Sequence, residues 1–410
     1  MDESAGFGVG IDVGTENVRA VVMSLNKDGS LAVVGYNEGK NAGMRKGTVA
    51  NLTGPAEAID RMLGEVERMS GYQVTKAYVS INGANVMSAK ADGMIALGGI
   101  DHEITYDDME RVENAAVVGR VPANRTILDV LPLSYTLDEQ DGIKDPIGMT
   151  GSRLVMNASV ISVLAPTAAN LAKVAECAKI DVQKMVPSVV AAARAVLSEK
   201  QMENGVAVVD LGSATTSVAV FEEGDLQYVG VIPIGANNIT NDLAIMLQID
   251  TDTAEDIKRR FVTGSFDDSD KDIIVRKGRE ELTFPREEVY QVAQDRLKEI
   301  FLGVKNELKT AHYDHRLPEG IVLVGGGAKM REISAFAKEV LEASVRVAMP
   351  KGFGGVADAI EKPEYAAAVG LAMMATLEGG AAPAKKQKRK SGGRKQGKSG
   401  GIFAKIFGGF

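Results

Sequence analysis

Cysteine and histidine are scarce in this chain of 410 residues. The single cysteine, Cys177, excludes an intramolecular disulfide framework and is typical of a reducing compartment. A helical pattern with alanines beside it predicts that Cys177 is a core residue. The three histidines, His102, His312 and His315, have no cysteine or carboxylate cluster near them in the sequence, so we expect surface histidines and no metal site. No Ser–His–Asp or Cys–His arrangement is indicated.

Long purely apolar stretches are also missing. The longest uncharged stretch, Leu154–Ala172, contains Asn157, Ser159 and Pro166, which a lipid-facing helix tolerates poorly. We therefore predict a buried strand over 154–164, followed by a helix with Pro166 in its first turn. Met1–Ser4 has two acidic residues and no basic one, so no signal peptide is expected.

Acidic residues are absent from the last 30 positions, where nine lysines and arginines lie. The whole chain has a net charge of −8, which leaves −17 on residues 1–380. An acidic body argues against a nucleic-acid-binding body and makes the basic tail a separate functional segment. With 45% hydrophobic residues, the body can form two or three cores of domain size.

One three-strand pattern occurs twice. Residues 8–35 and 206–230 each read as an apolar strand ending in Asp-x-Gly, a turn, an alternating strand, a glycine-containing turn and a third strand. Asp12 aligns with Asp210, and Gly14 with Gly212. Helical patterns follow at 55–69 and 238–247. We therefore expect two similar lobes that face each other.

The repeated turn is suited to phosphate binding, because glycine lets backbone N–H groups approach an anion without obstruction by Cβ. Asp12 and Asp210 would hold hydrated Mg²⁺, which keeps its waters and takes few carboxylates. The hydroxyl donors would be Thr15, Ser213, Thr215 and Thr216. The alternative is a pair of ordinary hairpin turns, in which Asp and Gly are common.

A third glycine-rich element, Gly320–Met330, reads as a buried strand, three glycines and the start of a helix over 332–341. Such a turn suits close approach to the adenosine and α-phosphate of a nucleotide. Its spacing fits neither a Rossmann nor a Walker A sequence.

Together these motifs resemble the actin/heat-shock-chaperone/sugar-kinase ATPase superfamily and, within it, the FtsA family of bacterial cell-division proteins, over nearly all of residues 6–378. The segment 124–154 is close to the FtsA pattern. The resemblance implies an α/β actin-like fold with two duplicated lobes around a nucleotide cleft and an inserted α+β subdomain. Helices at 185–197 and 363–373 resemble the two connecting helices of the hinge.

The resemblance also implies a division of the chain. The first lobe would comprise 1–83 and 163–198, with the inserted subdomain at 84–162. The second lobe would comprise 199–232 and 307–378, with a further subdomain at 233–306. A disordered basic linker would occupy 379–400, and an amphipathic membrane-targeting helix 401–410.

The cofactors implied are ATP and Mg²⁺. The residues that would contact the nucleotide come from the three glycine-rich elements and one helix: Asp12, Gly14, Thr15, Glu16, Asn17, Asp210, Gly212, Ser213, Ala214, Thr215, Thr216, Gly235, Glu255, Lys258, Gly325, Gly326, Gly327 and Met330.

Two departures from the superfamily bear on hydrolysis. Ser213 and Ala214 stand where the second phosphate loop commonly has glycines, and Val186 stands where chaperone relatives have a catalytic glutamate. Phosphoryl transfer to water needs a positioned water. We therefore expect ATP to bind as an assembly ligand, with slow or negligible hydrolysis, and we identify no catalytic residue.

The C-terminal nine residues form an apolar arc. At about 100° per residue, the large apolar residues fall within about 140°, with Lys405 opposite; they are Ile402, Phe403, Ile406, Phe407 and Phe410. With the basic run upstream, this pattern predicts reversible attachment to anionic inner-leaflet lipids. A disordered basic tail and a nucleic-acid-binding tail are the alternatives; the segregated phenylalanines argue against nucleic acid.

The resemblance implies a protein that polymerises with itself and anchors FtsZ filaments, with other division proteins, at the cytoplasmic face of the membrane at the division site. The FtsZ C-terminal peptide would bind near Arg296, Lys298 and Lys305, although a solvated charged helix face explains these residues about as well. A PilM-like pilus-assembly protein and a small-molecule kinase of the same fold are the alternatives.

Overall fold

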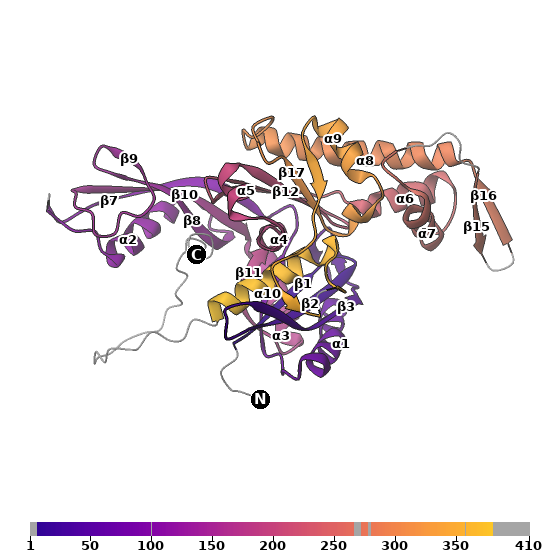
Figure 1. The fold of residues 1–410 in the computed structure, drawn as a ribbon, viewed down its shortest axis with the longest axis horizontal. Helices are drawn as coiled ribbons and strands as arrows, with labels where there is room; N and C mark the ends of the chain where they lie inside the picture. Colours follow the sequence, from indigo (N-terminus) through magenta and orange to yellow (C-terminus); the bar gives the residue numbers. More distant parts are fainter. Residues whose placement is uncertain (1–5, 100, 266–271, 278–279, 357, 380–410) are drawn as a thin grey trace.

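The computed structural model describes residues 6–99, 101–265, 272–277, 280–356 and 358–379. These residues form two lobes, drawn one below the other in Figure 1, and a smaller unit extends from the lobes on either side. The strands and helices of the lower lobe come from both ends of the chain, so the first and last described segments lie together.

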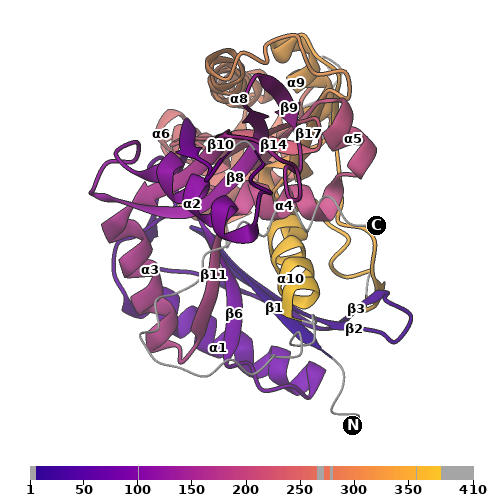
Figure 2. The same cartoon turned by 90° about the vertical axis from the view of Figure 1, so that its left-hand side faces the viewer.

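The lower lobe is built on a six-stranded sheet in the order β11-β6-β1-β2-β3-β19. Its strands are β1 (Phe7–Val13), β2 (Asn17–Leu25), β3 (Leu31–Lys40), β6 (Lys76–Ile81), β11 (Asp181–Pro187) and β19 (Gly354–Gly355). Helices α1 (Thr53–Ser70) and α3 (Ala165–Cys177) cover one face, and α4 (Ser188–Val196) and α10 (Ala366–Gly379) the other (Figure 2). A short hairpin, β4 (Met44–Arg45) and β5 (Thr48–Val49), follows β3.

Helix α10 packs unusually close to β1. A Cβ atom on Gly10 would lie 2.4 Å from the carbonyl oxygen of Ala368 and from the backbone nitrogen of Ala372. The helix is itself almost wholly buried and rich in alanine, so small residues on both elements allow this approach.

The inserted unit extends to the left in Figure 1 as a four-stranded antiparallel sheet in the order β7-β10-β8-β9. Its elements are β7 (Met87–Ala96), α2 (Tyr106–Val117), β8 (Arg125–Leu137), β9 (Gln140–Ile143) and β10 (Arg153–Leu164). It has a hydrophobic core of its own, which includes Val112, Leu154 and Met156. Helix α2 begins with a capping box, in which the side chains of Thr105 and Asp108 each bond the other's backbone N–H.

The upper lobe repeats the three-strand pattern of the lower lobe. Its sheet has the order β14-β13-β12-β17-β18, and β12 pairs antiparallel with β13 and parallel with β17, as β1 pairs with β2 and β6. Its elements are α5 (Glu199–Asn204), β12 (Val206–Leu211), β13 (Thr216–Glu222), β14 (Asp225–Ile232), β17 (Ile321–Val324), α9 (Ile333–Leu341) and β18 (Val345–Val347). Two 3-10 turns, Gly326–Lys329 after β17 and Pro363–Tyr365 before α10, contact each other.

A further unit extends to the right in Figure 1. Its elements are α6 (Ala236–Met246), α7 (Thr251–Phe261), β15 (Ile273–Lys277), β16 (Glu280–Phe284) and α8 (Arg286–Thr310). Helix α8 runs from this unit back to the upper lobe, and its buried residues join one hydrophobic cluster with those of β12 and β13.

Most predicted elements occur close to their expected bounds. The strand at 154–164 and the helix with Pro166 in its first turn are β10 and α3. Two expected hinge helices begin later than predicted: Met185–Pro187 belong to β11, and Pro363–Tyr365 form a 3-10 turn. In the first case β11 pairs with β6 through Pro187, so strand pairing continues to the residue before the helix.

One expected boundary differs from the structure. The prediction assigns residues 307–378 to the second lobe, but β19 pairs with β3 and α10 packs on β1, so 354–355 and 366–378 lie with the lower lobe. Pro363–Tyr365 contacts the turn Gly326–Lys329 and β17 of the upper lobe. The sequence pattern of α10 could not reveal this, because a uniformly apolar helix does not specify which sheet it covers.

Among the described residues, the helices are each too short or too polar to cross a membrane. The predicted linker, apart from Gly379 at the end of α10, and the predicted membrane-targeting helix lie outside the described residues.

Candidate functional site

The two Asp-x-Gly turns have matching backbone geometry. Asp12 lies one residue before the end of β1, and Asp210 one residue before the end of β12. In the first turn the N–H of Gly14 donates to the carbonyl of Asn17 at 3.1 Å; in the second, the N–H of Gly212 donates to the carbonyl of Thr215 at 3.0 Å. The repeat seen in the sequence therefore corresponds to two equivalent turns, one in each lobe.

Both turns open into a cleft of about 540 Å³ between the lobes. All but three of the residues expected to contact a nucleotide line this cleft, including Glu16, Ser213, Glu255 and Met330. The three consecutive glycines, Gly325–Gly327, line it as well. The structure thus brings together segments that are about 200 and 300 positions apart in the chain.

The three exceptions are Ala214, Thr216 and Gly235, which are not among the residues that line the cleft. Thr216 is fully buried, and its hydroxyl donates to the carbonyl oxygen of Ile234 at 2.8 Å, so it is not directed at a ligand. Gly235 packs behind the second turn, where a Cβ atom would lie 2.7 Å from the carbonyl oxygen of Gly212. Thr216 and Gly235 therefore pack under the turn and do not face the cleft. Strand alternation predicts this for Thr216, because neighbouring side chains point to opposite faces and Thr215 lines the cleft.

Charged and polar residues that the sequence analysis missed also line the cleft. They are Arg19, Glu38, Lys40, Asn82, Arg259, Lys329, Arg331 and Glu364. Strand pairing would have indicated two of them: Arg19 lies opposite Asp12 on β2, and Lys40 lies opposite Asn17 on β3. Asn82 follows β6, the parallel neighbour of β1, so its position at the same sheet edge could also have been inferred.

Asp12 is buried and Asp210 is partly buried, and the two are close enough to influence each other's ionisation. Burial raises the pKa of Asp12, which a hydrogen bond from Ser80 and the charge of Arg19 partly oppose. Burial and the neighbouring Asp12 raise the pKa of Asp210 to about 6, against a hydrogen bond from Ser188. Two carboxylates that burial disfavours in their charged form are well suited to a cation.

The residues present fit a magnesium ion. Among the described residues, Oδ1 of Asp12 is buried without a hydrogen-bond partner. Gly325 has a φ of +86°, and a Cβ atom there would lie 2.3 Å from Oδ1 of Asp210, so glycine keeps this carboxylate oxygen uncovered. No cluster of three or more His, Cys, Asp or Glu residues occurs in the described part of the chain. A site with two carboxylates agrees with a cation that retains most of its waters.

One end of the cleft has a buried polar group on α7. Nζ of Lys258 is 2.6 Å from Oε2 of Glu255 and donates to the hydroxyl of Thr240 at 2.8 Å. Burial would raise the pKa of Glu255, but hydrogen bonds from Lys258 and Thr240 outweigh it, so this pKa is lowered. A fixed carboxylate and ammonium at this wall can bind the hydroxyl groups of a ribose.

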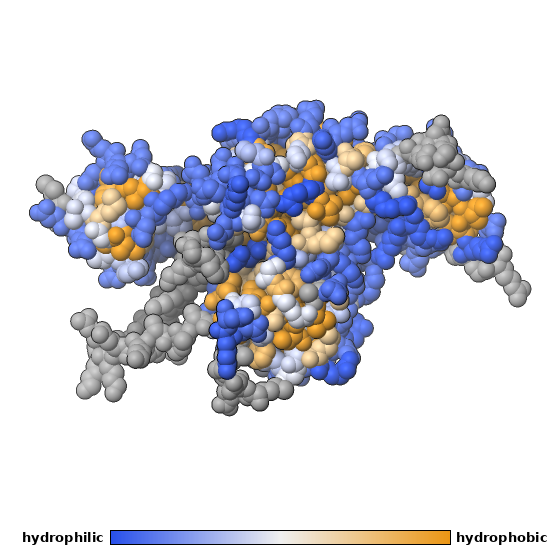
Figure 3. Space-filling view, in the orientation of Figure 1, coloured by the Kyte–Doolittle hydropathy of each residue, from blue (hydrophilic) through white to orange (hydrophobic). Residues whose placement is uncertain are grey.

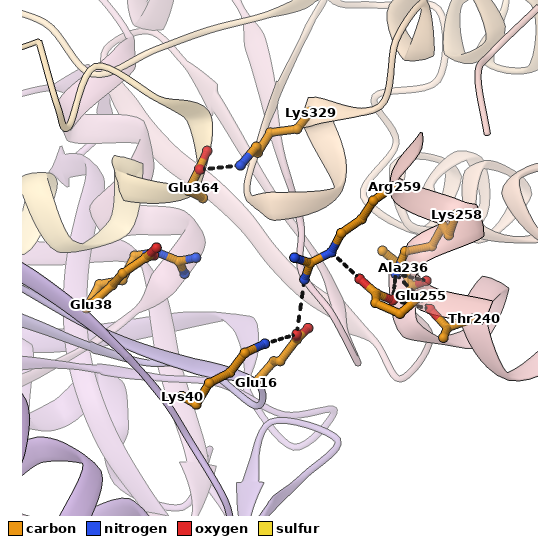
Figure 4. A network of polar contacts seen from close by, with 11 residues as sticks. Glu16, Glu38, Lys40, Ala236, Thr240, Glu255, Lys258, Arg259, Lys329 and Glu364 are labelled. Carbon is orange, nitrogen blue, oxygen red and sulfur yellow. Dashed lines mark hydrogen bonds and ion pairs between the residues drawn. The ribbon is translucent and has the colours of Figure 1, made fainter. Parts of the chain in front are cut away.

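A chain of charged side chains crosses the cleft, as Figure 4 shows. Lys40 and Glu16 of the lower lobe approach to 2.5 Å, and the same oxygen of Glu16 lies 3.4 Å from the guanidinium of Arg259 on α7. Arg259 in turn pairs with Glu255 at 2.6 Å. On another wall, Lys329 pairs with Glu364 at 2.7 Å. The Glu16–Arg259 pair therefore joins the lower lobe to the unit that contains α7.

One expectation about isolated residues is wrong. Cys177 is exposed at the end of α3, because the buried positions of that helix lie on the stripe that includes Leu171, Val174 and Ala175. His102 is partly exposed, and its Nε2 lies 2.9 Å from the buried Asp108 at the start of α2. His312 and His315 are exposed, as expected.

The basic residues of α8 are partly engaged within the molecule. Arg296 contacts both carboxylate oxygens of Asp242, at 2.6 and 3.0 Å, and Lys305 lies 3.2 Å from Glu342. Lys298 is exposed. The three side chains therefore do not form one open basic surface.

Comparison with known proteins identifies related sequences. The family model for cell division protein FtsA matches residues 207–370, and the model for the SHS2 domain inserted in FtsA matches residues 83–162. The cell division protein FtsA of Pseudomonas aeruginosa is 33% identical over 371 residues, which cover 89% of this chain and 88% of that protein. The FtsA of Bacillus subtilis is 32% identical, with 90% and 83% covered.

Solved structures show the same fold at lower identity. The PilM–PilN type IV pilus biogenesis complex matches with a TM-score of 0.66 at 16% identity, covering 90% of this chain and 98% of that one. MreB5 of Spiroplasma citri bound to ADP matches with a TM-score of 0.54 at 14% identity, covering 91% and 97%. These identities support the fold alone. Together with the two equivalent turns and the inserted sheet, the comparisons establish that the chain has an actin-like fold with an SHS2 insertion and belongs to the FtsA family of cell-division proteins.

Proposed function

We propose that this protein binds ATP with Mg²⁺, polymerises with itself and anchors FtsZ filaments to the cytoplasmic face of the membrane at the division site. The observation that carries the proposal is the pair of Asp-x-Gly turns facing one cleft in a chain of the FtsA family. Each further part of the proposal has its own support.

The cleft supports the nucleotide part of the proposal. Asp12 and Asp210 would hold the hydrated cation, the backbone of the two turns would bind the phosphates, and Gly325–Gly327 and α7 would receive the adenosine. Magnesium would neutralise phosphate charge beside these carboxylates. MreB5 structures with the same fold are bound to ADP and to AMPPNP. Val186 is buried and apolar where chaperone relatives have an acid, which favours slow or negligible hydrolysis.

Exposed apolar side chains support self-assembly. Tyr106 and Val118 on the inserted unit are 78% and 75% exposed, and Ile245 on α6 is 74% exposed. Figure 3 shows apolar surface both over the inserted unit and over the opposite unit. Patches on opposite sides of one chain suit head-to-tail contacts, which build filaments when they do not close into rings. MamK, which shares the fold at a TM-score of 0.51, was solved as a double helical filament.

The tail sequence supports membrane attachment. The basic run at 385–398 and the apolar arc at 402–410 provide two weak signals, electrostatic and hydrophobic. A single tail should bind weakly, whereas many tails on one polymer bind strongly through their effective concentration.

The FtsZ part of the proposal rests on the family and on α8. Of the three basic residues that we predict to bind the peptide, Lys298 is exposed. Arg296 would have to leave Asp242 before it could bind an acidic peptide. The pilus alternative has less support, because PilM shares 16% identity and FtsA relatives share 30–33% over a similar length.

A co-sedimentation experiment tests the whole proposal. The full chain and a chain ending at residue 401 are mixed with vesicles of mixed anionic and neutral lipid, with ATP–Mg²⁺, and with FtsZ or FtsZ lacking its C-terminal peptide. We expect the full chain to pellet with the vesicles and to recruit intact FtsZ. Equal pelleting of the two chains contradicts the membrane role, and equal recruitment of the two FtsZ forms contradicts the adaptor role.

A further inference from the structure

A buried serine connects two walls of the cleft. Ser188, the first residue of α4, is 2% exposed, and its hydroxyl lies behind two residues that line the cleft, Asn82 and Asp210. The hydroxyl oxygen is 2.6 Å from the amide oxygen of Asn82 and 2.9 Å from Oδ2 of Asp210. Three segments that are remote in the sequence therefore meet at one hydroxyl group.

The proton count determines how this group is arranged. A serine hydroxyl has one proton, and an ionised carboxylate can only accept a hydrogen bond. If Ser188 donates to Asp210, its contact with Asn82 must be a hydrogen bond that Ser188 accepts. A half-turn of the Asn82 amide provides it, because the NH₂ group then replaces the oxygen. Both contacts of the Ser188 hydroxyl are then hydrogen bonds, one accepted from Asn82 and one donated to Asp210.

In this arrangement the NH₂ group of Asn82 donates to Ser188, and the amide oxygen of Asn82 makes no hydrogen bond to Ser188. Because Asn82 lines the cleft, that oxygen becomes an acceptor on its wall. The nearby Val186, which is 1% exposed and apolar, offers no such group. The hydrogen-bond acceptor on the cleft wall would therefore be Asn82, after β6, and not a side chain at position 186 in β11.

We propose that Ser188 is a positioning residue of the ATP site: it fixes the carboxylate of Asp210 and turns the amide oxygen of Asn82 to the cleft, where it accepts a hydrogen bond from a water of the hydrated cation. This inference rests on the proposed nucleotide function. It predicts that loss of the Ser188 hydroxyl, which does not touch the nucleotide, weakens ATP binding with Mg²⁺ more than ATP binding without Mg²⁺.

The test compares ATP affinity with excess Mg²⁺ and with EDTA, by equilibrium titration of the full chain. For Ser188→Ala we expect about tenfold weaker binding with Mg²⁺, the magnitude of one hydrogen bond to a charged group, and less than about twofold change with EDTA. Ser188→Thr, which keeps the hydroxyl, should restore binding with Mg²⁺. Asn82→Ala should lower only the affinity with Mg²⁺, by about threefold, since it removes one water contact.

Ser159→Ala is the matched control, because Ser159 is equally buried but lies in β10 of the inserted unit. It should bind ATP like the unmodified chain under both conditions. The inference is overturned if Ser188→Ala binds ATP–Mg²⁺ normally, or if it loses affinity equally with and without Mg²⁺, which would indicate a merely structural role. If Ser188→Ala does not fold, Asn82→Ala decides the question. Failure of the unmodified chain to bind ATP would instead contradict the proposed function itself, and with it this inference.

Discussion

The two Asp-x-Gly turns have the same backbone hydrogen bond and different side-chain surroundings. In the lower lobe Asp12 lies opposite Arg19 on the adjacent strand, whereas in the upper lobe Asp210 lies opposite Ser217 and contacts Ser188. Both aspartates accept a hydrogen bond from a serine hydroxyl, and the charge of Arg19 acts on both. Asp12 differs in lying opposite Arg19 and in having a buried oxygen without a hydrogen-bond partner. The comparison teaches that the repeat preserves the turn, because the glycine geometry requires it, while the surroundings of the two carboxylates differ; the hydroxyl at Asp210 comes from α4 of the lower lobe.

The largest expected effect concerns the ionisation of Asp210. The folded-state pKa of Asp210 is about 6, above its ordinary value of 3.8, so the folded protein binds this proton more tightly than the unfolded chain. Its favourable contribution is complete below about pH 4 and is lost as the pH rises through 6; the shift corresponds to about 3 kcal/mol. Without metal, Asp210→Asn should thus gain up to about 3 kcal/mol over the unmodified chain at pH 7.

Urea unfolding in EDTA between pH 4 and 7.5 measures this difference, which should be small at pH 4 and grow towards pH 7. Asp256→Asn, an exposed carboxylate on α7, serves as the control and should show no such trend. A difference that is independent of pH would contradict the raised pKa.

The second prediction treats the aspartates as a pair. Asp12→Asn and Asp210→Asn should each weaken ATP binding with Mg²⁺ about a hundredfold, or about 2.7 kcal/mol, because each removes a carboxylate beside the cation. With EDTA the affinity should be unchanged or slightly higher, since one negative charge near the phosphates is removed. Calorimetric titration provides the measurement. If only one of the two variants has this effect, the carboxylates do not share the cation.

The third prediction tests the common backbone of the turns. A Cβ atom would lie 2.7 Å from the carbonyl oxygen of Asn17 at Gly14, and 2.9 Å from that of Thr215 at Gly212. Gly14→Ala and Gly212→Ala should therefore each cost about 2 kcal/mol of unfolding free energy, as overpacking does. Gly39→Ala on β3, where a Cβ meets nothing within 4 Å, is the control for denaturant unfolding. Unequal losses at the two turns would show that their backbones are not equivalent.

The smallest expected effect concerns the link between the lower lobe and the unit that contains α7. Arg259 is 60% exposed, and its distance to Glu16 is 3.4 Å. Exposed pairs contribute about 0–1 kcal/mol, so Arg259→Gln should lower the unfolding free energy by less than about 1 kcal/mol. Without nucleotide it should widen the distribution of distances between spin labels on the lower lobe and on α7. An unchanged distribution would mean that this pair does not hold the two parts together.

The sequence predicted the parts of the site that depend on local backbone chemistry. The Asp-x-Gly turns, the run Gly325–Gly327 and the two equivalent three-strand patterns could be recognised because glycine and aspartate mark tight turns at strand ends. It did not reveal Arg19, Lys40 or Asn82, since their place in the cleft depends on how strands pair. It also named Thr216 as a hydroxyl donor to the nucleotide, whereas this hydroxyl donates to the carbonyl oxygen of Ile234.

By itself, the sequence determined the family, the two lobes and the two aspartates at equivalent strand ends, because these follow from short motifs whose chemistry is local. Only the tertiary structure decided that α10, residues 366–379, packs on the first lobe and that Arg259 reaches Glu16 across the cleft. It also decided that Ser188 joins Asn82 to Asp210. Each of these contacts joins segments that are remote along the chain, and a contact of that kind depends on the packing of whole sheets and helices, which no local pattern specifies.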